Sequence, residues 1–222
     1  MKTFLVNKEK RNDSFKWVKD EILKKDQQVY WICPLVDQSD KIQAKSVKEI
    51  YEELVGVFGE KQVALLHGKM KSKAKQETMK QFSENKFKIL VSTTVIEVGV
   101  DVPNATVMVI ENAERFGLAQ LHQIRGRVGR SDIQSYCFLY TGDEISEQSK
   151  ERLKFFEKES NGLKIAEFDL QQRGPGEVYG TMQSGIPDLK IAKLNDINLI
   201  QHSKKIADKL FAKKIKHIEI FK

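Results

Sequence analysis

The sequence predicts an α/β fold: a doubly wound parallel sheet covered by helices, followed by a helical hairpin and a helical extension. Two observations in the first 140 residues support the sheet. Short, continuous apolar runs rich in β-branched and aromatic residues recur along the chain, as is typical of strands buried on both faces. Segments with apolar residues at helical spacing lie between these runs. Because right-handed crossovers join parallel strands, the functional loops are expected to begin at the carboxyl ends of the strands.

The expected elements of this domain follow in a regular order. The capping residues Asn12–Ser14 are expected to begin a helix whose apolar side chains are Phe15, Val18, Ile22 and Leu23. Strands are expected at residues 28–35, 63–66, 88–93, 106–111 and 135–140. Helices between them are expected at residues 47–58, 72–85 and 118–127.

The pattern changes after Gly142. A charged helix is expected at residues 147–159, and a second, short helix is expected to end near Leu170. A glycine-rich stretch then covers residues 173–185, and a final helix with lysines near its end is expected at about 195–211. The sequence thus predicts two domains, residues 1–142 and residues 143–222.

The composition is that of a soluble globular protein with an excess of basic residues. Hydrophobic residues make up 40% of the 222 residues and charged residues 31%, with a net charge of +7. This charge favours a polyanionic partner. No apolar run approaches the roughly 20 residues that span a bilayer, and charged residues follow Met1 too early for a signal peptide, so a cytoplasmic protein without a membrane partner is expected. Cys33 and Cys137 lie in strand-like runs and are expected to be reduced and buried, with no metal site.

The strongest chemical signal is the segment from Gln123 to Arg130, Gln-Ile-Arg-Gly-Arg-Val-Gly-Arg. Three arginines in six positions are costly to bury unless an anion pairs with them. At the end of a helix, Arg127 and Arg130 lie three positions apart and are expected to project from one face. Planar guanidinium groups in that arrangement suit phosphate oxygens. The alternative is a solvated basic loop, but the glycines at 126 and 129 favour close backbone packing.

This segment resembles the last conserved motif of superfamily-2 helicases, and two further segments agree with that resemblance. Residues 91–103, Val-Ser-Thr-Thr-Val-Ile-Glu-Val-Gly-Val-Asp-Val-Pro, resemble the preceding helicase motif. Residues 67–70, His-Gly-Lys-Met, resemble the segment that follows the second strand of such domains. Together the three segments, in this order, resemble the second RecA-like domain of these motors.

The resemblance implies a role for each matching residue. Arg127 and Arg130 are expected to reach the γ-phosphate of ATP, with Arg130 as the arginine finger and Gln123 helping to position the same group. Asp101, held by a turn at Gly99, is expected to accept hydrogen bonds from the nucleotide ribose. Residues expected to contact nucleic acid are Thr93, Thr94, His67 and Gly68. The threonines have ordinary strand capping as an alternative, and His67 has a purely structural one.

A second resemblance, over residues 169–185, narrows the family. This stretch, Asp-Leu-Gln-Gln-Arg-Gly-Pro-Gly-Glu-Val-Tyr-Gly-Thr-Met-Gln-Ser-Gly, is similar to the TRG element of the RecG family, a helical hairpin and loop that couple ATP-driven closure to movement along duplex DNA. Arg173 and Gln183 are the polar residues expected to work in this loop. The family often has a basic residue where this chain has Met182, which puts a DNA contact at that position in doubt.

Two related readings stay open beside the RecG family. The transcription-repair coupling factor Mfd shares the hairpin, and such a translocase acts on RNA polymerase. The loop residues Pro175 and Thr181 and the segments 111–117 and 30–34 favour RecG instead. A stand-alone nucleic-acid-binding module with a helicase fold is the alternative to an enzyme, but such a module has no need of an arginine finger.

The sequence contains neither a Gly-x-x-x-x-Gly-Lys-Ser/Thr loop nor an acidic motif for Mg²⁺. The resemblance therefore implies a part of a larger protein, in which ATP and Mg²⁺ are bound jointly with a first motor domain. The expected partners are that domain, an N-terminal wedge domain and branched or duplex DNA. The resemblance also implies a monomer in the bacterial cytoplasm that remodels stalled replication forks and Holliday junctions in recombination and repair.

Overall fold

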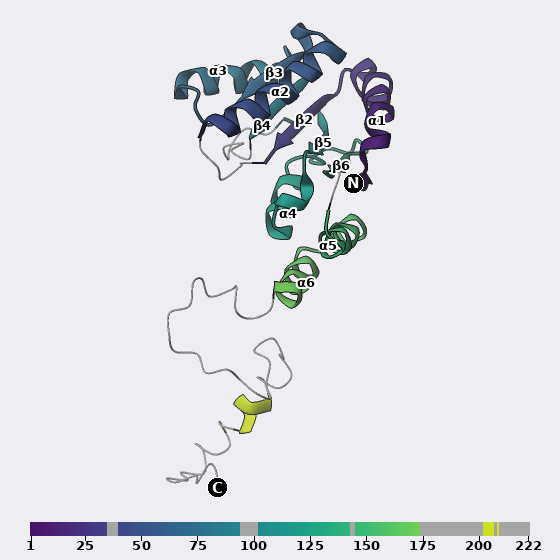
Figure 1. The fold of residues 1–222 in the computed structure, drawn as a ribbon, viewed down its shortest axis with the longest axis vertical. Coiled ribbons are helices and arrows are strands. Elements are labelled where there is room, and N and C mark those ends of the chain that lie inside the picture. Colours follow the sequence, from purple (N-terminus) through teal and green to yellow (C-terminus); the bar gives the residue numbers. More distant parts are fainter. Residues whose placement is uncertain (35–39, 94–101, 143–144, 174–201, 207, 209–222) are drawn as a thin grey trace. The chain divides into compact units, whose positions relative to one another are not determined.

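The computed structural model describes residues 1–34, 40–93, 102–142, 145–173, 202–206 and 208 (Figure 1). The chain forms two compact units, Met1–Ile165 and Ala166–Lys222. The domain boundary expected after residue 142 stays a prediction. Helix α5 (Glu147–Lys158) lies in the same unit as the sheet and contacts its first strand. No helix among the described residues is long and apolar enough to cross a membrane.

The sheet is entirely parallel, as the sequence predicts. Its six strands are β1 (Lys2–Val6), β2 (Gln28–Cys33), β3 (Val63–Leu66), β4 (Ile89–Thr93), β5 (Ala105–Ile110) and β6 (Tyr136–Tyr140). They pair in the order β1-β6-β5-β2-β4-β3. Strands β2, β4 and β5 are buried along their whole length, which explains their continuous apolar sequences. The α/β, RecA-like fold class is therefore confirmed.

Strand β1 is an element that the sequence analysis did not predict. Its five residues are only partly buried, and it lies at the edge of the sheet, paired with β6 alone. Its partner Tyr136–Tyr140 is far away in the sequence, so no local pattern marks the pairing. The outer side of β1 is held by α5, because the Leu5 N–H donates a 2.7 Å hydrogen bond to Glu157 Oε1.

Helices cover both faces of the sheet (Figure 1). Helix α1 (Arg11–Trp17), its irregular continuation to Lys25 and α2 (Asp40–Phe58) pack with Trp31 and the other side chains of one face. Helix α3 (Ser72–Ser83) packs on the opposite face, where Phe82 contacts Tyr30 at a ring-centre distance of 5.1 Å. The remaining helices are α4 (Leu118–Arg125), α5 and α6 (Gly162–Arg173).

Three further expectations concern the start of the first helix, the two cysteines and the final helix. Asn12–Ser14 do not precede the first helix as caps, because α1 begins at Arg11 and contains them; Ser14 Oγ instead donates to the Arg11 carbonyl at 2.6 Å. Cys33 and Cys137 are free and buried, as predicted, and burial raises the pKa of the Cys137 thiol to about 12. Most of the final helix expected at 195–211 lies outside the described residues, of which 202–206 and 208 are helical.

Candidate functional site

The predicted nucleic-acid contacts His67 and Thr93 lie at the carboxyl ends of the neighbouring strands β3 and β4. Leu66 pairs with Ser92 in the register of β3 and β4, so His67 and Thr93 come next on adjacent strands. Thr93 is 4% exposed, and its Oγ1 has no hydrogen-bond partner among the described residues. His67 is half-buried in a turn, closed by the Met70 N–H to its carbonyl, and Gly68 is exposed. This end of the sheet therefore holds a buried hydroxyl without a hydrogen-bond partner among the described residues, while Thr94 lies outside them.

The candidate phosphate-binding arginines lie beyond α4, not on it. The helix ends at Arg125, with Gly126 as its C-cap, so the prediction that it extends to Arg127 and that Arg127 and Arg130 share a helical face is wrong. The chain turns through Gly129, whose φ of +81° favours glycine. A Cβ there would also stand 3.0 Å from the Met1 side chain. The turn leaves Arg127 half-buried and Arg130 exposed, while Gln123 is exposed on α4.

This arginine loop, residues 126–131, lies near the amino ends of β5 and β6. Ser131 Oγ donates to the carbonyl of Pro103, just before β5 begins, at 3.3 Å. The chain then enters β6 at Tyr136. Arg127 and Arg130 therefore lie toward the amino ends of the strands. His67 and Thr93 lie at the carboxyl ends. The connection that carries the arginines begins, as expected, at the carboxyl end of β5 and returns through α4 to the amino end of β6.

Asp101 precedes Pro103 by two residues in the sequence. Asp101 and Gly99 lie outside the described residues, so their predicted contacts with a ribose stay predictions. The described residue Val102 is buried, with 4% of its surface exposed. The Ser131–Pro103 hydrogen bond joins the chain that follows the Gly99–Asp101 stretch to the arginine loop.

Arg125 has a structural role. The sequence analysis did not distinguish it from the phosphate-binding role expected of Arg127 and Arg130. It is only 6% exposed, and its Nη1 donates to the Phe156 carbonyl on α5 at 3.0 Å. Its guanidinium lies 4.0 Å from the centre of the Phe156 ring, and its Nη2 lies 3.2 Å from His122 Nδ1. Burial lowers the pKa of Arg125. A carbonyl and a ring face, in place of an anion, therefore compensate its burial.

Helix α5 also holds the segment that leads into α4. Arg152 on α5 donates to the carbonyls of Glu114 and Phe116 at 2.6 and 3.3 Å. The Gly142 N–H lies 3.4 Å from both carboxylate oxygens of Glu114. The contacts of Arg152 and Arg125 therefore fasten the segment before α4 and the last residue of α4 to α5. Sequence reasoning missed Arg152, because its carbonyl partners carry no sequence signal.

Gly162, the first residue of α6, lies against the half-buried ring of His122 on α4. A Cβ at this position would stand 2.8 Å from His122 Nε2. We expect Gly162→Ala to destabilise the chain by about 1–3 kcal/mol, because His122 must move and strain its contact with Arg125. Thermal unfolding measures this change.

The matched control for this substitution is Gly56→Ala on α2, where a Cβ would meet nothing within 4 Å. Alanine there is expected to be neutral or stabilising, since glycine weakens a helix interior. Removing the ring in the double variant Gly162→Ala/His122→Ala is expected to recover most of the loss. Equal destabilisation in the presence and absence of the His122 ring would contradict this packing.

The predicted residues of the glycine-rich loop are mostly beyond the described structure. Arg173 is the last residue of α6, and its side chain is not described. Gln183 lies outside the described residues altogether. The two helices expected before this loop are confirmed as α5 and α6, with α6 continuing three residues past Leu170.

Comparison with known proteins identifies the class to which this fold and this set of motifs belong. The profile described as helicase conserved C-terminal domain matches residues 13–132, more than half of the chain. The chain therefore belongs to the helicase C-terminal domain family. Within it, the chain corresponds to the C-terminal part of the RecG helicases: the profile described as ATP-dependent DNA helicase RecG, domain 3, C-terminal, matches residues 159–219.

Individual relatives agree with this assignment. The chain is 48% identical to the ATP-dependent DNA helicase RecG of Thermotoga maritima over 90% of this chain and 26% of the relative, and 48% identical to that of Aquifex aeolicus over 94% and 27%. A structure of RecG bound to a three-way DNA junction matches with a TM-score of 0.69 and 43% identity over 93% of this chain and 25% of that one. The chain thus spans about a quarter of the length of these relatives.

Proposed function

We propose that this chain is the second motor domain and translocation element of an ATP-dependent DNA translocase that remodels branched DNA. The observation that carries the proposal is the arginine loop. Its backbone is held by the hydrogen bonds of the Gly126 and Arg127 N–H groups to carbonyls of α4 and by the Ser131–Pro103 hydrogen bond, while Arg130 is exposed. A surface guanidinium on a rigid support is what transition-state stabilisation of phosphoryl transfer requires. The match to RecG domain 3 favours this reading over an Mfd-like translocase.

ATP is proposed to lie between the arginine loop and a first motor domain that supplies the phosphate-binding loop and the carboxylate for Mg²⁺. Arg130 neutralises the charge that develops on the γ-phosphoryl group, and Arg127 and Gln123 hold the same group in place. Asp101 accepts hydrogen bonds from the ribose. The hydrogen bond between Ser131 and Pro103 supports this arrangement, because Pro103 follows Asp101 by only two positions in the sequence.

DNA is proposed to lie along the carboxyl edge of the sheet. Thr93, Thr94, His67 and Gly68 contact the phosphates there, with hydroxyl and backbone N–H groups as donors. The buried Thr93 Oγ1 supports the proposal, since it has no partner among the described residues. In this proposal the nucleotide lies toward the amino ends of the strands and DNA lies at their carboxyl ends, with α4 between them.

Coupling is proposed to run from α4 through α5 to the TRG loop. Arg125 and Arg152 tie α4 and the segment before it to α5, so a displacement of the arginine loop on ATP binding moves the helical hairpin with it. Arg173 and Gln183 transmit that motion to duplex DNA. The proposed protein is a monomer in the bacterial cytoplasm.

Junction remodelling tests this function. We define the assembled motor as a fusion protein based on the Thermotoga maritima relative. In it, this chain replaces the matching segment and follows the upstream residues of that relative. With ATP and Mg²⁺, the assembled motor is expected to separate a fluorescently labelled three-way DNA junction, and this chain alone is not. An assembled motor that folds, binds the junction and still leaves it intact would contradict the proposal.

A further inference from the structure

Glu111 is a buried carboxylate that the proposed mechanism does not use. It follows the last residue of β5, is 6% exposed, and its backbone N–H donates to the Ile32 carbonyl at 2.8 Å. A carboxylate with so little access to water costs free energy unless it is paired and hydrogen-bonded. Glu111 is both: its Oε1 accepts from Trp31 Nε1 at 2.8 Å, and Arg11 Nη1 donates to its Oε2 at 3.0 Å.

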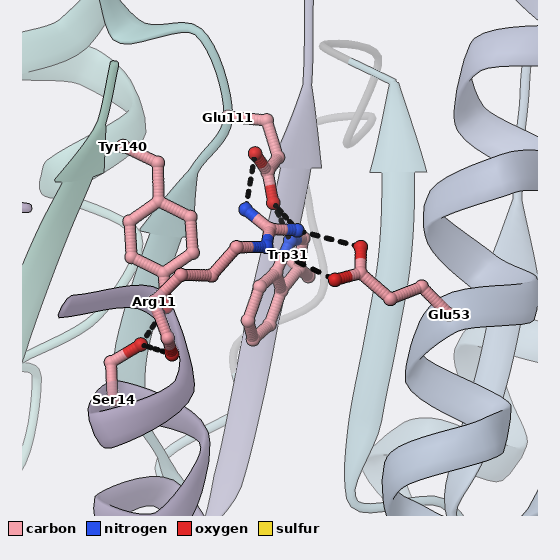
Figure 2. A network of polar contacts seen from close by, with 6 residues as sticks. All are labelled: Arg11, Ser14, Trp31, Glu53, Glu111 and Tyr140. Carbon is pink, nitrogen blue, oxygen red and sulfur yellow. Dashed lines mark hydrogen bonds and ion pairs between the residues drawn. The ribbon is translucent and has the colours of Figure 1, made fainter. Parts of the chain in front are cut away.

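Arg11 completes a network that joins four elements (Figure 2). Its Nη2 lies 2.8 Å from Glu111 Oε1, and its Nε and Nη2 donate to Glu53 on α2 at 3.1 and 2.8 Å. Its guanidinium also lies 5.0 Å from the Tyr140 ring centre. Burial alone would lower the pKa of Arg11, but the hydrogen bonds to Glu53 and Glu111 raise it above its ordinary value. Arg11 is therefore committed to these carboxylates and is not a phosphate contact.

The network lies beside open space. A cavity of about 310 Å³ adjoins it, lined in part by Arg11, Glu53, Glu111 and Tyr140. The chain leaves Glu111 through Asn112, whose φ of +47° is left-handed, and a short 3₁₀ turn, and then enters α4. Ala113 and Phe116 are buried and pack the inner side of this turn, so the hydrogen bonds of Glu111 fix its start on the open side.

We infer that Glu111 is a positioning residue for the arginine loop, acting through α4. Glu111 anchors the first residue of the segment, Arg152 anchors its middle, and α4 is a rigid continuation with Leu118 and Leu121 fully buried. A shift at Glu111 therefore moves the whole helix, including Gln123 and the loop that follows Gly126. This inference rests on the proposed function for its catalytic consequence, but not for its structural one.

The structural arm of the test uses hydrogen exchange in this chain. Glu111→Gln keeps the side-chain shape and an acceptor for Trp31 but removes the charge that holds Arg11. The matched control, Glu53→Gln, weakens Arg11 from its more exposed side and leaves Glu111 in place. We expect faster amide exchange over residues 112–125 in Glu111→Gln and not in Glu53→Gln. In a Trp17→Phe background, where Trp31 is the only tryptophan of the chain, the emission of Trp31 is expected to shift in Glu111→Gln.

The catalytic arm uses the assembled motor. We expect Glu111→Gln to lower kcat for DNA-stimulated ATP hydrolysis about ten- to a hundredfold, since small displacements of a catalytic group have effects of that size. The KM for ATP is expected to change little, and Glu53→Gln is expected to behave like the unaltered motor.

Two results would overturn the inference. One is unchanged exchange over residues 112–125 in Glu111→Gln, and the other is a loss of kcat that only parallels a loss of melting temperature. An unaltered assembled motor without ATPase activity would instead refute the proposed function, and the exchange arm would then decide the positioning role by itself.

Discussion

Replacing Arg130 by alanine in the assembled motor is expected to lower kcat for ATP hydrolysis by about 10³-fold or more. A guanidinium that meets the γ-phosphoryl group acts mainly on the transition state, so KM for ATP and affinity for DNA are expected to stay nearly unchanged. Arg127→Ala is expected to show the same pattern. Steady-state ATPase assays and DNA-binding titrations of the same preparations measure both quantities.

The control for Arg130→Ala removes a cation of similar exposure from another part of the surface. Lys24 is well exposed and pairs only with its helical neighbour Asp20, at 2.8 Å, among the contacts of the described residues. Such surface pairs contribute little, so Lys24→Ala is expected to leave kcat unchanged. If Arg130→Ala raised only the KM for DNA, Arg130 would be a DNA contact and the finger assignment would be wrong.

Replacing Arg173 by alanine is expected to uncouple ATP hydrolysis from DNA movement. Arg173 is the last residue of α6 and precedes the proposed TRG loop in the sequence, whereas the proposed finger Arg130 belongs to the loop that follows α4. DNA-stimulated ATPase is therefore expected to persist within about twofold, while junction unwinding falls at least about tenfold, because only the step after closure is affected. Both rates and the melting temperature are measured on the same variant.

Arg125→Met provides a matched comparison for the Arg173 result. Methionine fills a similar space without the charge, but it removes the hydrogen bond from α4 to the Phe156 carbonyl. This variant is expected to weaken both ATPase and unwinding and to lower the melting temperature, because it loosens α4 itself. A normally folded Arg173→Ala variant with equal losses in ATPase and unwinding would be inconsistent with a coupling role.

Sequence periodicity was sufficient for the buried part of the fold. The strands β2 to β6 are continuous apolar runs with turn residues between them, so local pattern and tertiary environment agree. Strand β1 escaped prediction because it is short, partly exposed and paired with a distant strand at the edge. Its existence depends on β6 and on the Glu157 hydrogen bond, neither of which is visible in Lys2–Val6 alone.

The sequence indicated which residues belong to the candidate site, but not where they lie in the fold. The motif marks Arg125, Arg127 and Arg130 alike, yet tertiary contacts bury Arg125 against Phe156 and end the helix before the other two. The separation of the arginines from Thr93 depends on the direction of α4, which runs back across the sheet. Glu111 and Arg11 meet across 100 positions, so sequence spacing gave no indication of their pairing.

DNA-stimulated ATP hydrolysis, measured in parallel on this chain and on the assembled motor, tests the central claim most directly. The claim is that this chain supplies one wall of a nucleotide site, with Arg130 as its finger. It predicts no turnover above background for the chain alone, and DNA-stimulated turnover for the assembled motor that Arg130→Ala abolishes. Turnover by the purified chain alone that Arg130→Ala abolishes, or an assembled motor indifferent to Arg130→Ala, would contradict it.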